Sequence, residues 1–282
     1  MKLITVMLIL LIIPIFSQAY YKEVPPGINA ADFYVVDLEF QNKVKPEYFK
    51  NSVRFEWQQL SQLGEQSRGY LKKDLSSLRD DLRSLGLHPT KKIVIIGPGL
   101  KGRGQEGRVA YTLIKLGFKN VYISTRSKLI SYGFQAQPVF PAVAKKTEAF
   151  KINQRTDLSI EKKEILDLLK KGKFLPCIDV RPDGFPAEVI VGTIQCKKIS
   201  WRNFFNEDLQ IKPEATTLLA GFEKTDRVIL LSEAGLASAG VMLALRELGY
   251  NKAVIFEGGF SGLRALSDGL GLRKESSVKS IN

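Results

Sequence analysis

The clearest pattern of apolar and polar positions lies between residues 227 and 263. An unbroken apolar run at 228–231 predicts a buried strand, and a tight turn of small residues follows at 232–235. Apolar residues then recur with helical spacing at Val241, Leu245 and Leu248. Gly249 ends this helix, and a second apolar run covers 253–256. The stretch therefore predicts a strand, a tight loop, a helix and a second, parallel strand.

The rest of the chain contains further elements of the same kinds. Apolar runs predict strands at 33–38, 53–57, 93–96, 121–123 and 178–180, and one more that ends at Trp201. Helical stripes cover 71–85 and 109–116, and Ser159 is placed to cap another helix. Residues 126–160 show little periodicity, which is typical of a linker.

The two halves of the chain repeat each other. Asp37 closes a strand in the first half, and Asp179 sits in the corresponding strand of the second. Trp57 and Trp201 follow these aspartates at similar distances, and we expect both to be core residues at strand ends. Leu116-Gly117-Phe118 matches Leu248-Gly249-Tyr250, and each is followed by a short apolar strand. Two copies of one α/β unit account for the length of 282 residues.

These motifs resemble those of the tandem rhodanese family, to which the thiosulfate and mercaptopyruvate sulfurtransferases belong. The matching residues are Asp179 and Arg181 at a strand end, Gly192, Ile194 and Ile199 in the next turn and strand, Leu248-Gly249-Tyr250, and Glu257-Gly258-Gly259-Phe260. The resemblance implies an α/β fold of two tandem rhodanese-like domains, each a mainly parallel sheet flanked by helices. We expect domain 1 at 20–140 and domain 2 at 141–282, with a linker at about 127–158 and a disordered polar tail at about 274–282.

The family's active loop opens with a catalytic Cys, and Ser232 stands in its place. The expected loop consists of Ser232, Glu233, Ala234, Gly235, Leu236, Ala237 and Ser238. Its backbone N–H groups and the positive end of the next helix would form a cradle for an anion. Sulfur transfer needs a thiolate, whereas a hydroxyl ionises far above neutral pH. The resemblance is therefore to a degenerate member without the catalytic Cys, in which Asp179 and Arg181 support the loop and Glu233 opposes an anionic substrate.

The chain has few candidate residues for other kinds of catalysis. A hydrolytic Ser232 would need a base, and His88, the only histidine, lies in the first half of the chain. One His and two Cys without ligand spacing predict no metal site. We expect no cofactor.

A glycine-rich loop follows the strand at 93–96. Its sequence, GPGLKGRGQEGR, fits G-x-G-x-x-G twice, but no acidic residue follows the next strand, where a dinucleotide's ribose would bind. Three interpretations of this loop stay open: a dinucleotide site, an anion- or partner-binding loop, and a loop without a ligand. The residues of the possible anion loop are Gly97, Gly99, Lys101, Gly102, Arg103, Gly104 and Arg108.

The net charge and the N-terminal segment provide predictions about the protein's partners and its cellular location. The net charge is +13, but the chain has no block of five basic residues and no nucleic-acid motif, so we expect no nucleic acid partner. Lys2 and the apolar run at 4–16 predict a signal peptide at 1–19, cleaved after Ala19. We therefore expect an exported protein, periplasmic or secreted, without a stable membrane anchor after cleavage. An uncleaved anchor is the alternative.

The chain has only two cysteines, Cys177 and Cys196. They fall just ahead of two strands that the family fold places side by side, so an exported protein could join them in a disulfide. The alternative is a pair of buried thiols. Both would lie at the far end of their strands from the active loop, about 15 Å away at about 3.3 Å per residue.

Three functions are consistent with these residues. The first is an exported rhodanese-like protein without sulfurtransferase activity, which binds a small anion, a peptide or a protein partner. The second is an active sulfurtransferase with a non-standard nucleophile. The third is a structural envelope protein. An open, solvated cradle around Ser232 would favour the first over the third, and a closed loop plugged by Leu236 would favour the third.

Overall fold

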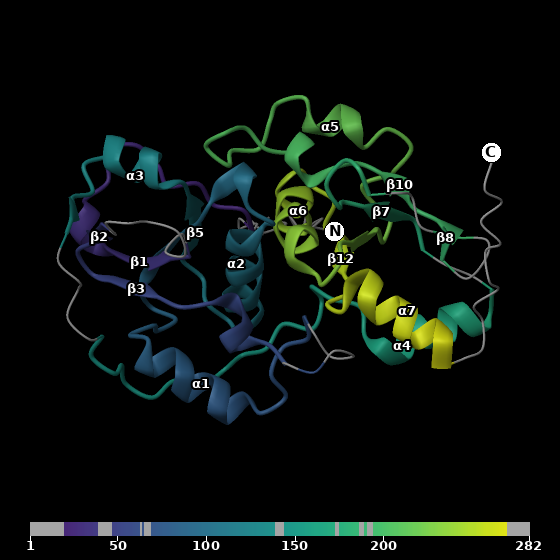
Figure 1. The fold of residues 1–282 in the computed structure, drawn as a ribbon, viewed down its shortest axis with the longest axis horizontal. Coiled ribbons are helices and arrows are strands. Elements are labelled where there is room, and N and C mark those ends of the chain that lie inside the picture. The colour runs from purple at the N-terminus through teal and green to yellow at the C-terminus, as the bar shows by residue number, and fades with distance from the viewer. Residues whose placement is uncertain are drawn as a thin grey trace, which may run out of the picture.

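The protein is built from two similar α/β units placed side by side (Figure 1). The computed structural model describes residues 20–38, 47–62, 64, 69–138, 144–172, 175–185, 189–190 and 194–269. The predicted signal peptide at 1–19, Gly192 and the tail at 274–282 lie outside these ranges.

The first unit centres on a parallel sheet with the strand order β3-β1-β4-β5. The strands are β1 (Phe33–Asp37), β3 (Ser52–Arg54), β4 (Lys92–Ile96) and β5 (Val121–Ser124). The helices are α1 (Leu75–Ser84), α2 (Gln105–Lys115) and α3 (Arg126–Ser131), with 3-10 turns η1 (Ala30–Asp32), η3 (Trp57–Leu60) and η5 (Gly99–Lys101). An antiparallel pair, β2 (Tyr48–Phe49) and β6 (Ala136–Gln137), completes the described part of this unit.

The second unit repeats this plan with the strand order β10-β7-β11-β12, again parallel. The strands are β7 (Cys177–Asp179), β10 (Lys197–Lys198), β11 (Ile229–Leu231) and β12 (Val254–Ile255). The helices are α4 (Lys162–Lys170), α5 (Ala215–Leu218), α6 (Leu236–Glu247) and α7 (Gly259–Gly269), with the 3-10 turn η6 (Trp201–Asn203). A small antiparallel pair is formed by β8 (Val189–Ile190) and β9 (Ile194–Gln195).

The repeat extends to individual residues at the carboxyl ends of the strands. Asp37 lies opposite Arg54 of the edge strand β3, and Asp179 lies opposite Lys198 of the edge strand β10. In both units a buried aspartate thus forms an ion pair with a basic residue at the same position of the sheet. The tandem α/β arrangement predicted from the sequence is confirmed.

Helices α2 and α6 join the two units, and both lie at the centre of the molecule (Figure 1). They approach so closely that a Cβ atom on Gly107 would lie 2.5 Å from the Cα atom of Gly240. A Cβ atom on Gly104 would lie 2.8 Å from the Cα atom of Ala237. The apolar cores of the two units merge across this contact into one buried cluster, so the units share a core.

Several helices and strands begin or end at residues other than those predicted. The strand expected at 53–57 ends at Arg54, because Trp57 turns inward and begins a 3-10 helix that buries Trp57 and Leu60. Trp201 likewise begins a 3-10 helix instead of ending a strand, since β10 stops at Lys198. Both tryptophans are buried. The helix expected from residue 71 starts at Leu75, because the Asp74 carboxylate accepts the first free N–H groups of the helix.

The predicted linker is wrong in its first part. Helix α3 starts directly after Thr125, whose hydroxyl accepts a hydrogen bond from the Lys128 N–H. Strand β6 then pairs with β2 near the start of the unit. Residues 126–137 therefore belong to the first unit, while 144–157 have no helix or strand. The domain boundary at 140 stays a prediction.

Candidate functional site

The predicted active loop lies at the carboxyl end of β11, immediately before α6. Gly235 is the last residue before the helix and has a left-handed backbone, with φ 73°. A Cβ atom there would lie 2.4 Å from the Glu257 carbonyl oxygen, so only glycine fits. The loop thus has the strand–turn–helix geometry that the sequence predicts.

Ser232 is held inside this loop. It is only 4% exposed, and its hydroxyl lies 3.1 Å from the hydroxyl of Ser238, which is fully buried. The Ser238 N–H also donates to Ser232 Oγ, at 3.3 Å. Neither contact supplies a base that could take the Ser232 proton. The loop is closed, and of its residues only Glu233 and Leu236 are partly exposed.

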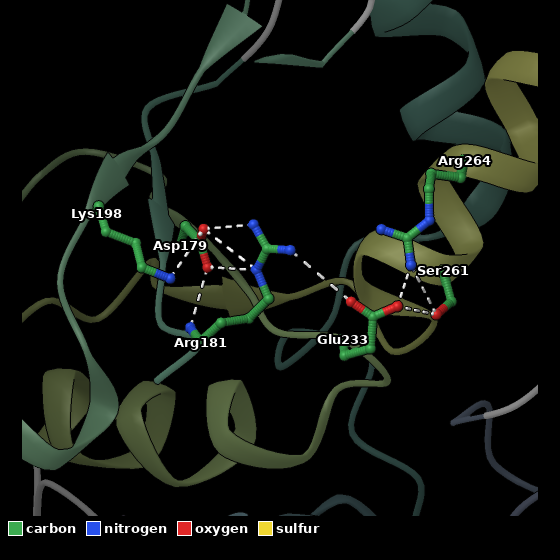
Figure 2. Close-up of polar contacts among 6 residues, drawn as sticks. All are labelled: Asp179, Arg181, Lys198, Glu233, Ser261 and Arg264. Carbon is green, nitrogen blue, oxygen red and sulfur yellow. Dashed lines mark hydrogen bonds and ion pairs between the residues drawn. The ribbon is translucent and has the colours of Figure 1, made fainter. Parts of the chain in front are cut away.

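Glu233 follows Ser232 in the loop, and its carboxylate is bound on both sides by residues of the same unit. Ser261 donates a hydrogen bond of 2.7 Å to Glu233 Oε1, and Arg264 forms an ion pair with the same oxygen. On the other side, Arg181 Nη1 lies 3.9 Å from Glu233 Oε2. Figure 2 shows the carboxylate between the two guanidinium groups. A carboxylate of the chain itself therefore occupies the space between the two arginines at the loop.

Asp179 and Arg181 form a buried ion pair beside the loop. The Arg181 side chain donates to both Asp179 oxygens, at 2.8 Å from Nη2 and 3.0 Å from Nε. Lys198 reaches the same carboxylate at 3.3 Å (Figure 2). The guanidinium also lies 4.0 Å from the centre of the Phe260 ring. This fixes Arg181 in one orientation at the edge of the loop.

The motif Glu257-Gly258-Gly259-Phe260 fits against the loop's carbonyl groups. Phe260 N–H donates to the Ser232 carbonyl at 2.9 Å, and Ser261 N–H donates to the Glu233 carbonyl at 3.1 Å. A Cβ atom on Gly259 would lie only 1.9 Å from the Ser232 carbonyl oxygen. The first turn of α7 is thereby attached to the loop, which explains the glycine at 259.

Glu257 links the loop to the first unit, a role that the sequence did not reveal. Its side chain is 8% exposed and accepts hydrogen bonds from Lys115 Nζ at 2.6 Å, Tyr111 Oη at 2.7 Å and the Leu71 N–H at 3.1 Å. Burial alone would raise the pKa of this carboxyl, but the charges of Lys115 and Arg108 and the hydrogen bonds from Lys115 and Tyr111 outweigh it, so the pKa lies below its usual value.

The first-unit segment that begins at Gly69 passes directly beneath the loop. A Cβ atom on Gly69 would lie 2.5 Å from the Ala234 carbonyl oxygen. Arg108 of α2 donates a hydrogen bond to the Gly69 carbonyl and is 1% exposed. Arg108 was predicted to belong to an anion loop, but it is buried between the two units. The sequence alone does not show which residues surround Arg108, because its neighbours depend on how α2 packs against α6.

The glycine-rich loop of the first unit contains its own carboxylate. Glu106 is 1% exposed, and its Oε1 accepts the Gly99 N–H at 2.7 Å. A Cβ atom on Gly97 would lie 2.5 Å from the same oxygen. A cavity of about 430 Å³ borders the loop and is lined by the basic Lys101 and Arg126 and by the acidic Glu207 and Asp208. The lining therefore has no excess of positive charge, which argues against an anion or a dinucleotide at this loop.

The two cysteines form a disulfide between β7 and the residue before β10, with a sulfur–sulfur distance of 2.09 Å. Cys177 lies opposite Ile229, three residues before Ser232. The separation from the loop is therefore about 10 Å at about 3.3 Å per residue, shorter than the predicted distance, because β7 has only three residues. In this disulfide state neither sulfur offers a thiolate to the loop.

His88 lies in the turn before β4, where it contacts Thr90 and the Phe150 ring. Within the described ranges, no three His, Cys, Asp or Glu side chains are grouped as metal ligands would be. Nor is any helix in the described part of the chain long and apolar enough to cross a bilayer.

Comparison with known proteins places this geometry in a known fold. Residues 161–266 match the family model of the rhodanese-like domain. No curated protein gives a significant sequence match. Among solved structures, the chain is similar to the 3-mercaptopyruvate sulfotransferase SseA of Escherichia coli, with 15% identity, a TM-score of 0.66, and 81% of this chain and 92% of that chain covered.

Two further structures show the same likeness. For Tum1 of Saccharomyces cerevisiae the identity is 15% and the TM-score 0.68, with 88% of this chain and 96% of that chain covered. For the 3-mercaptopyruvate sulfurtransferase of Leishmania major the values are 14% and 0.66, with 89% and 78% covered. The second unit thus matches a rhodanese-like domain, and the described part of the chain has the fold of two tandem rhodanese-like domains.

Proposed function

We propose that this protein is a rhodanese-like protein without sulfurtransferase activity, which acts by binding. The observation that supports this most directly is the identity of the loop residues. A hydroxyl paired with Ser238 stands at the first position, and the next residue, Glu233, places a carboxylate between Arg181 and Arg264. A persulfide needs a thiol at that position. An anionic sulfur donor would also have to displace Glu233 from Arg181 and Arg264.

The test is sulfur transfer from thiosulfate and from 3-mercaptopyruvate to cyanide or a thiol. Wild-type protein, Ser232→Cys and Ser232→Cys/Glu233→Gly are compared. We expect no turnover by the wild type, weak turnover by the single variant, and more by the double variant, since the carboxylate is then gone. The only two cysteines are paired in a disulfide, so the variant's free thiol reports on residue 232 alone.

Each outcome decides between named alternatives. Turnover by the wild type would refute the proposal and support the second function, a sulfurtransferase with a non-standard nucleophile. Absence of turnover by all three proteins, with the variants folded, would mean that the loop has lost more than its thiol, so that no catalytic geometry is retained.

The third function, a structural envelope protein, is favoured by one observation. Ser232 is 4% exposed, so the loop is closed. Leu236 does not plug it, since that residue is partly exposed. The segment at Gly69 and the first turn of α7 instead lie against the carbonyl groups of the loop. Binding of a small anion, peptide or protein partner then has to involve a different surface or displace Glu233.

We also propose that the protein is exported. The disulfide between Cys177 and Cys196 supports this, because disulfides persist in oxidising compartments. Expression of the full chain in a bacterium, followed by mass spectrometry of the periplasmic and secreted fractions, tests it. A mature N-terminus at Tyr20 is expected, and full-length protein confined to the membrane fraction would contradict cleavage.

A further inference from the structure

Residues 20–24, here called the strap, lie across both units of the protein. On the first unit, the Ile123 N–H of β5 donates a hydrogen bond of 3.0 Å to the Lys22 carbonyl. On the second unit, the Tyr21 hydroxyl donates a hydrogen bond of 2.6 Å to the Leu209 carbonyl, and the Tyr21 side chain is buried. The strap therefore connects the two units in addition to the packing of α2 against α6.

The side chain of Tyr20, the first residue of the strap, contacts both α6 and the segment 144–157. Its hydroxyl accepts hydrogen bonds from Arg155 Nη2 at 2.8 Å and from Arg246 Nη1 at 3.3 Å. Asp157 forms ion pairs with both arginines, at 2.8 Å and 2.7 Å. Arg246 is only 4% exposed. Because these contacts fix the side chain of Tyr20, they also fix the position of its main-chain nitrogen.

The main-chain nitrogen of Tyr20 lies against a carboxylate at the end of α6. Its N–H donates a hydrogen bond of 3.0 Å to Glu247 Oε2. Glu247 is the last residue of α6 and is exposed. The helix dipole makes a negative charge unfavourable at this end and a positive charge favourable. In the described part of the chain, Glu247 pairs with no lysine or arginine side chain. A peptide N–H carries no charge, so it leaves this carboxylate without a counter-charge.

Cleavage after Ala19 would supply that charge. Hydrolysis of the peptide bond between Ala19 and Tyr20 consumes one water molecule, gives Ala19 a carboxylate and turns the Tyr20 nitrogen into an α-amino group. The ordinary pKa of an α-amino group is about 7.7–8.0, so it is mostly protonated at neutral pH. An ammonium group with three donors then stands where the neutral N–H contacts Glu247.

We propose that this α-ammonium group binds the Glu247 carboxylate and fastens the strap, so that removal of the signal peptide completes the contact between the two units. The proposal rests on the export and the cleavage after Ala19 that are proposed above. It gives the processing step a structural consequence, because the mature protein gains an ion pair that the precursor lacks.

The charges around Tyr20 determine the size of the effect. Arg155 and Arg246 lie at its hydroxyl and are paired with Asp157, and the Lys22 ammonium group donates to a main-chain carbonyl. Because the new pair is exposed, it should lower the equilibrium constant of unfolding about two- to fivefold. The pKa of the α-ammonium group should then rise by about 0.3–0.7. The stabilisation is present below about pH 7.7 and is lost as the pH rises through the folded-state pKa.

The experiment compares processed proteins that differ in the position of the ammonium group or in its partner. The full chain is expressed in a bacterium, and the mature protein is purified from the periplasmic or secreted fraction. A second chain carries Gly-Ser inserted between Ala19 and Tyr20, which moves the ammonium group by two residues without changing the net charge. Glu247→Gln removes the carboxylate. Glu214→Gln is the matched control, because Glu214 is exposed and makes no capping hydrogen bond.

Mass spectrometry of the N-terminal peptide gives the cleavage site, and the pH dependence of its acetylation rate gives the pKa of the amine. Urea unfolding is measured at about pH 7 and about pH 9.5. We expect a raised pKa in the wild type and in Glu214→Gln, and an ordinary pKa in the insertion variant and in Glu247→Gln. The wild type should be more stable than the insertion variant at the lower pH only.

The possible failures can be told apart. A mature chain that does not begin at Tyr20 would refute the cleavage, and the proposal with it. A chain that begins at Tyr20 but has an ordinary amine pKa would overturn the proposal and leave the export intact. A stability difference that persists at about pH 9.5 would also overturn it, because the insertion would then act through the chain and not through the charge.

Discussion

The buried carboxylate of Glu257 is predicted to be the main polar link between the two units. It accepts hydrogen bonds from Lys115 Nζ, Tyr111 Oη and the Leu71 N–H of the first unit, and it is the carboxylate that pairs with Lys115. In Glu257→Gln the side chain keeps its shape but loses its charge, and one oxygen becomes an amide donor. Lys115 and Arg108 are then left buried without a counter-charge.

The expected loss follows from this burial. Removing one partner of a buried ion pair costs about 3–5 kcal/mol, because the remaining charge stays desolvated. For a chain of this size, each kcal/mol lowers the melting temperature by about 2–4 °C, so we expect a decrease of about 10 °C. The matched control is Glu164→Gln, which breaks the half-exposed pair with Arg227 and should cost less than about 1 kcal/mol.

The pH dependence of stability gives a second readout for the same carboxyl. Its pKa in the folded protein lies below the ordinary value, which is about 4.3 for an unfolded glutamate. The stabilisation is therefore complete above about pH 4.3 and is lost as the pH falls through the lower, folded-state pKa. Glu257→Gln should lack this part of the acid-induced loss.

Urea unfolding at several pH values, monitored by tryptophan fluorescence, measures both effects. Lys115→Met combined with Glu257→Gln tests whether the cost comes from the unpaired lysine, because the double variant should recover part of the stability. A Glu257→Gln protein within about 1 kcal/mol of the wild type would refute the reasoning, and so would a double variant whose losses simply add.

Three further predictions concern the second unit. The disulfide closes a loop with a sequence separation of 19, so Cys177→Ser/Cys196→Ser should lose about 3 kcal/mol, and a reductant should bring wild-type and variant denaturation curves together. Gly259→Ala should destabilise by about 2 kcal/mol more than Gly133→Ala in the same unfolding assay, because both have positive φ but only a Cβ atom on Gly259 would meet a carbonyl oxygen, at 1.9 Å. Glu233→Gln should change stability by less than about 1 kcal/mol, since its side chain is 46% exposed, and a larger loss would show that the pair with Arg264 is more than a surface contact.

The fold could be predicted because local patterns and turn chemistry agreed with it. The apolar run at 228–231, the stripe of α6 and the left-handed Gly249 each appear in the structure as expected. The errors lie where a side chain competes with the backbone pattern, as at Trp57, which turns into the core and ends a strand early. Asp74 shortens a helix by the same kind of local competition.

The candidate site was less predictable, because its contacts join residues far apart in the sequence. The pattern predicted a tight turn after the strand at 228–231, and the resemblance to the rhodanese family identified the loop residues. The partners of Glu257, however, lie 142 and 146 residues away on α2, and nothing near them in the chain indicates a buried carboxylate. Arg108 follows a glycine-rich loop and so suggested an anion site, whereas the crossing of α2 and α6 buries it.

The loops of the two units differ from an anion-binding cradle in the same way. In the first, the Glu106 carboxylate accepts a hydrogen bond from the Gly99 N–H, and in the second, the Glu233 carboxylate lies between Arg181 and Arg264. At each loop an acidic side chain of the chain itself occupies the position that an external anion would need. An external anion at either loop would therefore have to displace a carboxylate that is already hydrogen-bonded or paired within its own unit.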